Sequence, residues 1–571
     1  AEVRIKSKEG INVLQNYNTR GFQSSIEPNL LFGLGKTTTI DSLQVNWPDG
    51  KIQILTNVKA DQVVTLKNSE ASLTKNSVAA PVATTFEEVS GKLIDGAAVH
   101  HEDRYNDFND EILLTRMLST EGPRVITGDV NNDNLTDFIL LGAAGDPDKL
   151  FVQKQDGKFH FQQNAAFGRD AAFESTCGVL FDYDKDGDMD LLIGSGGNET
   201  TMDHSYFIVR LYTNNGNGNF TPNPTAFPPV IGNFSTALAE DFDKDGDMDI
   251  FLGARNVPGN YGLPPRSYLL RNDNGKWSEI APAALANVGM VTDAAWADTD
   301  ADGDKDLVVV GDWMAITIFK NDNAVFESTS TIPNSNGWWN RIKAADLDGD
   351  GDLDFILGNW GLNTKFKASA DKPLTMFVND FDNNGKSEFI INWYPPLDAI
   401  AYPFCTKSEL TTQLPVLKKQ ILHYEDYGHK TYDSLFSPEV RSHSLKYEVN
   451  NLQTAILWNN SGTFDLQVLP GEAQLSPVFG IAADDMDGDG KTDIWLGGNF
   501  YALKPQAGRH DASKGVYLKG NGNRSFTAIP PLQSGIRVEG EVRDAGFVQV
   551  NGSKHLIVGR NNSGVMLFRK E

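Results

Sequence analysis

The sequence predicts an all-β chain, namely a β-propeller of seven blades, or of eight in an alternative count, preceded by a small β-rich domain. Three observations lead to this prediction. An Asp-rich loop recurs seven times, each copy runs directly into a short apolar strand, and most copies are one propeller blade apart. The chain has 571 residues, of which 40% are hydrophobic, so its length and composition suffice for such a fold and its core.

The first 68 residues read as a separate β-rich unit. Segments such as 42–45 alternate like strands, with Gly and Pro between them. Residues 69–84 are rich in Ser, Ala, Thr and Pro and lack apolar periodicity, which predicts a linker before a propeller over 85–571. Because the chain begins at Ala1 inside a strand-like pattern, we expect it to be part of a longer protein.

The repeated loop places acidic residues, or an Asn, at its positions 1, 3, 5 and 9, usually with Gly at position 6. An Asn/Gly β-hairpin signature often follows the next strand. The predicted ligands are, loop by loop, Asp129, Asn131, Asp133 and Asp137, with Leu135 through its backbone carbonyl; Asp182, Asp184, Asp186 and Asp190; Asp241, Asp243, Asp245 and Asp249; Asp298, Asp300, Asp302 and Asp306; Asp346, Asp348, Asp350 and Asp354; Asp380, Asp382, Asn384 and Glu388; and Asp485, Asp487, Asp489 and Asp493.

This ligand pattern favours calcium, with about seven ions in the chain. Calcium accepts roughly six to eight oxygen ligands, whereas magnesium demands stricter octahedral geometry. An EF-hand would need a Glu at position 12 and flanking helices. Position 12 is instead apolar in all seven loops, which excludes the EF-hand and predicts calcium loops in β-hairpins: Leu140, Ile193, Leu252, Val309, Leu357, Ile391 and Leu496.

Composition excludes several classes of function. The formal net charge is −26, which makes nucleic acid an unfavourable partner. No apolar run is long enough to span a membrane as a helix. Cys177 and Cys405 are the two cysteines, and the sequence leaves open whether they pair.

The spacing of the loops locates one irregular region. The first Asp residues of successive loops are 53, 59, 57, 48, 34 and 105 residues apart. We therefore predict a long insertion at about 389–450, while eight blades result if the loops at 346 and 380 belong to separate blades. A last unit over 543–569 has lost its ligands, and residues 85–89 are predicted to join it as an outer strand that closes the propeller.

These residues resemble known families. Residues 479–498, beginning Phe-Gly and containing the last Asp loop, are similar to the FG-GAP/VCBS repeat of integrin α-subunit propellers and of many bacterial surface proteins. The resemblance extends over roughly 86–571. The first unit resembles an ASPIC/UnbV domain in residues 20–22, 31–35 and 40–50.

The pairing of these two domains is that of cartilage acidic protein and its bacterial relatives. The resemblance implies a secreted or surface-attached protein, and large bacterial members carry a further propeller upstream. The resemblance indicates the fold, the bound metal and the cellular compartment more directly than it indicates a molecular activity.

The search for further sites gives two kinds of candidate. His100 and His101 are adjacent on an extended segment and should point in opposite directions, and His510 is expected to brace a loop rather than to contact a ligand. No catalytic constellation emerges. Four aromatic residues follow equivalent strands and would form a ligand-binding ring on one face, the alternative being packing between blades: Trp313, Trp360, Trp393 and Phe500.

The resulting hypothesis is a non-enzymatic, calcium-binding scaffold for a protein or glycan at the outer surface of a Gram-negative bacterium. Family context alone suggests an outer-membrane nutrient-uptake complex, contacted through the 389–450 insertion. The alternative hypothesis is a calcium-dependent polysaccharide lyase or hydrolase.

Overall fold

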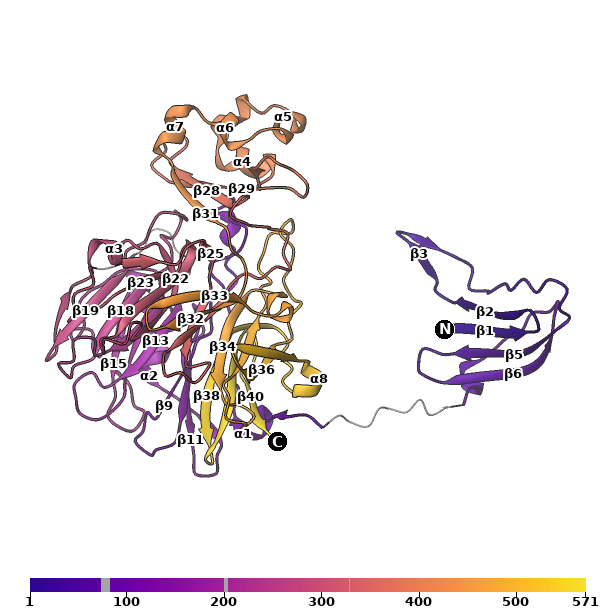
Figure 1. Cartoon of the computed structure of the whole chain (residues 1–571), viewed down its shortest axis with the longest axis horizontal. Coiled ribbons are helices and arrows are strands. Elements are labelled where there is room, and N and C mark those ends of the chain that lie inside the picture. Colours follow the sequence, from indigo (N-terminus) through magenta and orange to yellow (C-terminus); the bar gives the residue numbers. More distant parts are fainter. Residues whose placement is uncertain (73–82, 200–203, 328) are drawn as a thin grey trace. The chain divides into compact units, whose positions relative to one another are not determined.

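The computed structural model describes residues 1–72, 83–199, 204–327 and 329–571, which form two compact units, Ala1–Ala83 and Thr84–Glu571 (Figure 1). Most of the predicted linker, residues 73–82, lies outside the described residues. Its first residues belong to the first unit, because η1 (Asn68–Glu70) ends there and Ser72 forms a β-bridge with Ile52.

The first unit is a small antiparallel sheet. Its core is formed by Ile5, Ile40, Leu43 and Val45, which alternate with exposed residues as expected for a sheet with one buried face. The sheet order is β2-β1-β5-β6, and β3 pairs with β4 in a separate hairpin. The strands are β1 (Glu2–Ser7), β2 (Gly10–Gln15), β3 (Thr19–Gly21), β4 (Ser24–Ser25), β5 (Thr39–Asn46) and β6 (Ile52–Lys59).

In the second unit, seven sheets follow one another among the described residues, and their innermost strands form a closed ring. Strand pairing in these sheets is antiparallel except between β12 and β8. The first three sheets contain β8 (Ile94–Asp95) to β12 (Phe159–Gln162), with β9 (Val125–Gly128), β10 (Asp137–Leu140) and β11 (Lys149–Gln153); β13 (Ser175–Phe181), β14 (Asp190–Ser195), β15 (Val209–Thr213) and β16 (Thr221–Pro222); and β17 (Phe234–Glu240), β18 (Asp249–Ala254), β19 (Tyr268–Asp273) and β20 (Lys276–Glu279).

The next four sheets contain β21 (Met290–Ala297), β22 (Asp306–Met314), β23 (Thr317–Phe319), β24 (Thr329–Thr331) and β25 (Gly337–Trp338); β26 (Arg341–Ala345), β27 (Asp354–Gly358), β32 (Ala455–Asn460) and β33 (Thr463–Val468); β34 (Val478–Asp484), β35 (Asp493–Gly498), β36 (Val516–Gly522) and β37 (Ser525–Ile529); and β38 (Glu541–Val550), β39 (Ser553–Asn561), β40 (Met566–Lys570) and β7 (Phe86–Glu88).

The ring is closed by contacts between its innermost strands. Successive first strands pack against one another in the order β9, β13, β17, β21, β26, β34 and β38, and β38 then contacts β9. The last sheet combines both ends of the unit, since β7 pairs antiparallel with β40 in the register Phe86–Lys570 to Glu88–Phe568. This arrangement confirms the all-β propeller fold and the predicted outer strand, and it leaves no free edge between the first and last sheets.

The insertion is longer than the predicted 389–450. Strand β27 pairs directly with β32, so the intervening residues 359–454 lie outside the ring sheet. They form a sheet of their own, ordered β30-β29-β28-β31, from β28 (Leu374–Asn379), β29 (Glu388–Trp393), β30 (Tyr402–Pro403) and β31 (Leu445–Val449). The loop at Asp380 joins β28 to β29 and therefore belongs to the insertion, which explains the short spacing before it and the long spacing after it.

The helices are short, and five of the described ones lie in the insertion, at the upper end of the unit in Figure 1. None of the described helices is long and apolar enough to cross a membrane. The insertion contains α4 (Lys407–Gln413), η4 (Pro415–Lys419), α5 (Tyr424–Gly428), α6 (Tyr432–Leu435) and α7 (Pro438–His443). The remaining helices are α1 (Ser90–Leu93), η2 (Asp107–Asn109), α2 (Ala165–Arg169), η3 (His204–Tyr206), α3 (Ala283–Ala286), η5 (Gly471–Gln474) and α8 (Pro531–Ser534).

Candidate metal centres

Six of the seven Asp loops connect the first and second strands of a ring sheet, so they lie on one face of the propeller. The seventh, at Asp380, makes the same strand-to-strand connection within the insertion sheet. The apolar residue at position 12 is buried within the second strand in every case, as in Ile193 and Val309, which are 0% exposed. The prediction of β-hairpin loops rather than EF-hand loops is thus confirmed.

The position 1 carboxylate organises the turn of each loop. In all seven loops its Oδ2 accepts a hydrogen bond from the backbone N–H of position 6, at 2.7–3.2 Å. Position 6 has a positive φ in each loop, for example +93° at Gly187 and +88° at Gly246, which explains the preference for Gly there. The first loop uses Asn134 with φ +64° instead.

The position 9 carboxylate binds two backbone segments at once. One of its oxygens accepts from the N–H of position 2 in all seven loops, at 2.8–3.2 Å. In the six ring loops the other oxygen accepts from an N–H in or just after the third strand, at 2.7–2.9 Å. This residue therefore joins the Asp loop to the neighbouring hairpin, a role that the ligand pattern alone did not reveal.

Burial raises the pKa of the position 9 carboxyl groups. The value is about 6 for Asp137, Asp190 and Asp354, and about 7 for Asp249 and Glu388. In Asp137 and Asp249 the backbone N–H donors oppose this rise, whereas the other carboxylates of the same loop add to it. A divalent cation between these groups would favour their ionised form.

The loop residues fit a hard divalent cation. Carboxylate oxygens of at least three residues lie within 4.8 Å of one another in several loops, including Asp182, Asp184 and Asp190. Within the part of the chain that the structure describes, three buried ligand oxygens have no hydrogen-bond partner, namely Asp182 Oδ1, Asp300 Oδ1 and Asp382 Oδ1. Unpartnered buried oxygens that converge within an all-oxygen donor set are the arrangement expected around calcium.

Basic side chains reach the ligands of some loops. Lys519 pairs with Asp487 and Asp489, while Lys320 pairs with Asp300 at 2.5 Å. These cations neutralise part of the local charge and would compete with a bound ion.

Neighbouring loops are also linked to one another, a feature that the sequence analysis missed. The position 4 side chain of one loop contacts the position 7 Asp of the next: Lys185 pairs with Asp247, and Lys244 with Asp304, both at 2.6 Å. The position 7 Asp also accepts an N–H from the adjoining hairpin, as in Asp247 with Asn274 at 2.7 Å. The Asp that recurs at position 7 of the loops was the feature of the sequence that could have indicated these contacts.

The proposed aromatic ligand face is not a surface. Trp313, Trp360 and Phe500 do come together, but they are only 2–3% exposed. Trp393 is partly buried against the same cluster, which also contains Leu374 and other residues of the insertion. The insertion sheet covers the ends of these strands. These residues therefore pack in the interior, which was the alternative prediction, and no ligand can stack on them.

The histidine candidates are structural. His100 is fully buried while His101 is exposed, as expected for neighbours on an extended segment. His510 is 5% exposed and exchanges two backbone hydrogen bonds with Phe500, which braces its loop. Cys177 and Cys405 are both free.

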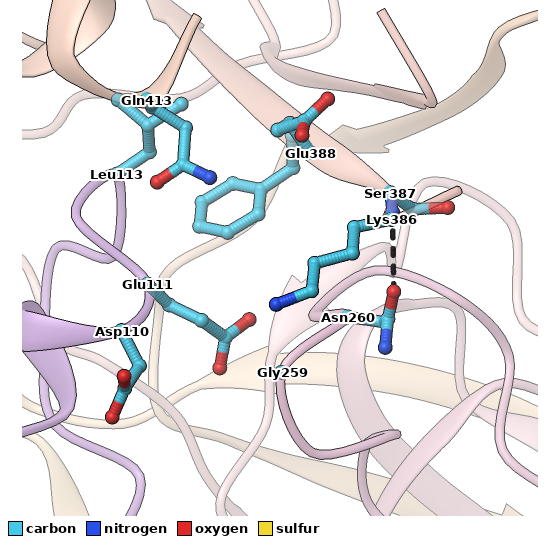
Figure 2. A pocket seen from close by; sticks show the side chains of 10 residues that line it. Asp110, Glu111, Leu113, Gly259, Asn260, Lys386, Ser387, Glu388 and Gln413 are labelled. Atoms are coloured by element: carbon cyan, nitrogen blue, oxygen red, sulfur yellow. Dashed lines mark hydrogen bonds between the residues drawn. The ribbon is translucent and has the colours of Figure 1, made fainter. Parts of the chain in front are cut away.

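A small cavity separates the insertion from the ring. Its volume is about 120 Å³, and Glu111, Asn260, Lys386 and Glu388 are among the residues that line it (Figure 2). The side chain of Lys386 extends between Glu111 and Asn260, whose Oδ1 accepts the N–H of Ser387 at 3.1 Å. The volume is far below the roughly 300–1,000 Å³ of pockets that enclose small-molecule ligands.

Comparison with known protein families identifies both units. A model described as ASPIC and UnbV matches residues 1–73, and a model of the FG-GAP-like repeat matches 129–193, 182–252 and 298–357. The chain carries an ASPIC and UnbV domain followed by FG-GAP-like repeats. Each matched FG-GAP-like segment begins at position 1 of one Asp loop, and each ends at position 12 of a loop.

Similarity to other known proteins is remote. No curated protein sequence matches the chain significantly. Among solved structures, BBS1N in complex with ARL6DN, soaked with lead, is 9% identical, with a TM-score of 0.35 and coverage of 82% of this chain and 96% of that chain. The Dos1 propeller is 11% identical, with a TM-score of 0.35 and coverage of 81% and 97%.

Proposed function

We propose that this protein is a calcium-stabilised propeller that acts as a binding or scaffold subunit, without catalytic activity of its own. The observation that carries the proposal is the uniform construction of the Asp loops. Several loops bring three carboxylates within 4.8 Å of one another, and in all seven loops the position 1 and position 9 residues are fixed by backbone N–H groups. Such sites would bind calcium. In each blade the ion would then stabilise the loop that connects the first strand to the second.

The proposed location is the extracellular side of a bacterial outer membrane. Calcium loops of modest affinity are filled where calcium is abundant, as it is outside cells. About seven divalent ions would also neutralise 14 charges of the formal −26. The acidic surface would then become less self-repelling, which favours the compact state.

The insertion is the proposed contact surface for a protein partner. Residues 389–450 contain six Lys and Arg against seven Asp and Glu, so this segment is nearly neutral in a strongly acidic chain. Leu422 lies between η4 and α5, Tyr424 is the first residue of α5, and the two are 68% and 66% exposed. Exposed apolar residues in a neutral segment are typical of protein interfaces, and a transporter complex for nutrient uptake is the partner class that we propose.

A native pull-down tests this function. The tagged chain is incubated with solubilised outer membranes in calcium, and again with chelator. We expect a defined partner in calcium, reduced recovery in chelator, and loss of the partner with the variant Leu422→Ser/Tyr424→Ser. The matched control is Leu532→Ser, which removes an apolar residue that is 75% exposed on a ring helix.

Two outcomes would contradict the proposal. Equal recovery of the partner by the Leu422→Ser/Tyr424→Ser variant would remove the insertion as the contact surface. Release of sugar products from a polysaccharide by the calcium-loaded protein would replace the scaffold with a lyase or hydrolase.

A further inference from the structure

A second group of acidic residues lies outside the Asp loops, where the segment before η2 meets the second ring sheet. Glu174 directly precedes β13 and Glu199 follows β14, while Glu102 belongs to the incoming segment. The side chains of Glu174 and Glu199 are neighbours, because both lie against Gly197. If Gly197 carried a Cβ atom, that atom would be 3.0 Å from Glu174 Cγ and 3.0 Å from Glu199 Cδ.

Further carboxylates surround this group. Asn198 Nδ2 donates to Asp107 Oδ1 at 2.7 Å and to Glu111 Oε2 at 3.0 Å, which fixes these acids beside Glu199. The side chain of Asp107 is completely buried, and its other oxygen accepts from Ser119. Four acidic residues from three separate segments therefore meet around Asn198, and the charge of Glu102 acts on Glu174.

Two of the carboxylate oxygens have no partner among the described residues. Glu174 is 4% exposed, and its Oε2 accepts the N–H of Ala144 at 2.6 Å, but its buried Oε1 accepts no hydrogen bond. The buried Oε1 of Glu199 is also unpartnered, while its Oε2 accepts the N–H of Asn198 at 2.9 Å. A buried oxygen without a donor is costly, and a cation bound between these carboxylates would satisfy it.

The protein supplies no cation to this group. Within the described part of the chain, no Lys, Arg or His nitrogen lies within 4.0 Å of a carboxylate of Glu102, Glu174 or Glu199. Arg543 lowers the pKa of Glu102 from a distance, but it is paired with Glu541 at 2.8 Å.

Burial and mutual repulsion raise the pKa of all three acids, to about 8 for Glu102 and Glu199. For Glu174, the charges of Glu102 and Glu199 add to the effect of burial. A bound cation would reverse this effect.

We propose that the carboxylates of Glu102, Glu174 and Glu199 bind a divalent cation of the calcium type, at a site distinct from the Asp loops. The donors are all oxygens, which favours calcium over zinc or copper. Asp103 and Asp107 provide additional negative charge around the site, since both raise the pKa of Glu199.

Such an ion would fasten the incoming segment to the ring. Glu102 is already tied to the last sheet, because its N–H donates to Asn562 Oδ1 at 3.0 Å and its carboxylate accepts from Asn561 Nδ2. Glu174 and Glu199 flank strands of the second ring sheet. The ion would thus connect the sheet that closes the ring with the second sheet.

Calcium stoichiometry tests the proposal. Protein dialysed against calcium is analysed for calcium per chain, for the wild type, for Glu174→Gln/Glu199→Gln and for the loop variant Asp182→Asn/Asp184→Asn. We expect each double variant to lose one ion and the combined variant to lose two. The exposed Glu472→Gln serves as the control and should lose none.

The Gln variant is expected to remain folded, because it removes repulsion between buried carboxylates. Its melting temperature in chelator should equal or exceed that of the wild type, and its gain on calcium addition should be smaller. An unchanged calcium count in Glu174→Gln/Glu199→Gln overturns this proposal alone. If Glu174→Gln/Glu199→Gln loses one ion but the Asp loops bind no calcium, the proposed function is overturned and the site proposed in this subsection is not.

A crystal soaked in manganese gives an answer that does not depend on variants. We expect an anomalous difference peak between the Glu102, Glu174 and Glu199 carboxylates. A water molecule at that point, with peaks confined to the Asp loops, would overturn the site.

Discussion

At the scale of single residues, the members of one Asp loop do different things. Position 9 is buried and binds two backbone segments, whereas position 5 is exposed and faces the predicted ion. In the fourth loop these residues are Asp306 and Asp302. Asp306 accepts the N–H of Thr299 and of Asn321, at 3.1 and 2.8 Å.

The variant Asp306→Asn should destabilise the protein even in chelator. An amide retains one oxygen, so one of the two buried N–H groups loses its acceptor, at a cost of about 1–3 kcal/mol. Asp302→Asn keeps an oxygen for the N–H of Asp304 and should change the chelated protein by less than about 1 kcal/mol. The measurement is urea unfolding with and without calcium. Equal losses in chelator would show that position 9 has no separate structural role.

His510 provides a pH-dependent contribution to stability. Burial lowers the pKa of His510 below its ordinary value of 6.5, although the charge of Asp511 opposes this effect. The unfolded chain therefore binds a proton at this residue at a higher pH than the folded chain does, so stability is lost as pH falls below about 6.5. In His510→Gln the loss of unfolding free energy between pH 7.5 and pH 5 should be smaller than in the wild type. The exposed His423→Gln is the control, and an unchanged loss in His510→Gln would contradict the assignment.

The residue scale also shows what sequence spacing can predict. The ligand positions follow from local spacing along the loop, and the loops are formed as expected. The aromatic residues Trp313 and Trp360 were placed correctly at equivalent strand ends, but their exposure depends on the insertion that covers them. The contact between the insertion sheet and these aromatic residues joins segments that are far apart in sequence. A periodic pattern along the chain cannot predict such a contact.

At the scale of elements, β7 is a short strand with a large effect on closure. Phe86 is 4% exposed and packs edge-on against Tyr517, with ring centroids 5.3 Å apart. Arg569 Nε donates to the carboxylate of Glu87 at 2.5 Å, across the pair of strands.

Removal of β7 should open the last sheet. A chain starting at residue 90 is expected to melt well below one starting at residue 84, and Phe86→Ala should cost about 3 kcal/mol because it leaves a cavity. The control is the comparison of the chain starting at 84 with the whole chain, which should have similar transitions for the propeller, because residues 1–83 form a separate unit. Equal melting of the chains starting at 84 and 90 would show that β7 is dispensable.

The insertion is the element whose bounds the sequence placed least well. The 380 loop looked like another blade because its ligand pattern is local and complete. Its membership of a separate sheet depends on the pairing of β27 with β32, which are distant in sequence. The outer strand β7 was predictable because it resembles the strand that follows each hairpin.

At the scale of the whole molecule, the proposed calcium ions and the formal net charge of −26 should act on stability together. Chelation of the protein should lower its melting temperature and restore repulsion among the loop carboxylates. Added salt should raise the melting temperature of the chelated protein, because it screens the repulsion between exposed carboxylates. It should change the melting temperature of the calcium-loaded protein less. Calorimetry in calcium and in chelator, each at low and high salt, checks this expectation. Unchanged melting after verified removal of calcium would overturn the calcium assignment.

The pairing of β7 with β40 has a mechanical consequence. The N-terminal domain precedes β7 in the chain, so tension applied through that domain acts first on the outermost strand of the closing sheet. Under load this strand would be peeled away before any inner strand is disturbed. The first part of the propeller to yield would therefore be the strand by which it is joined to the N-terminal domain.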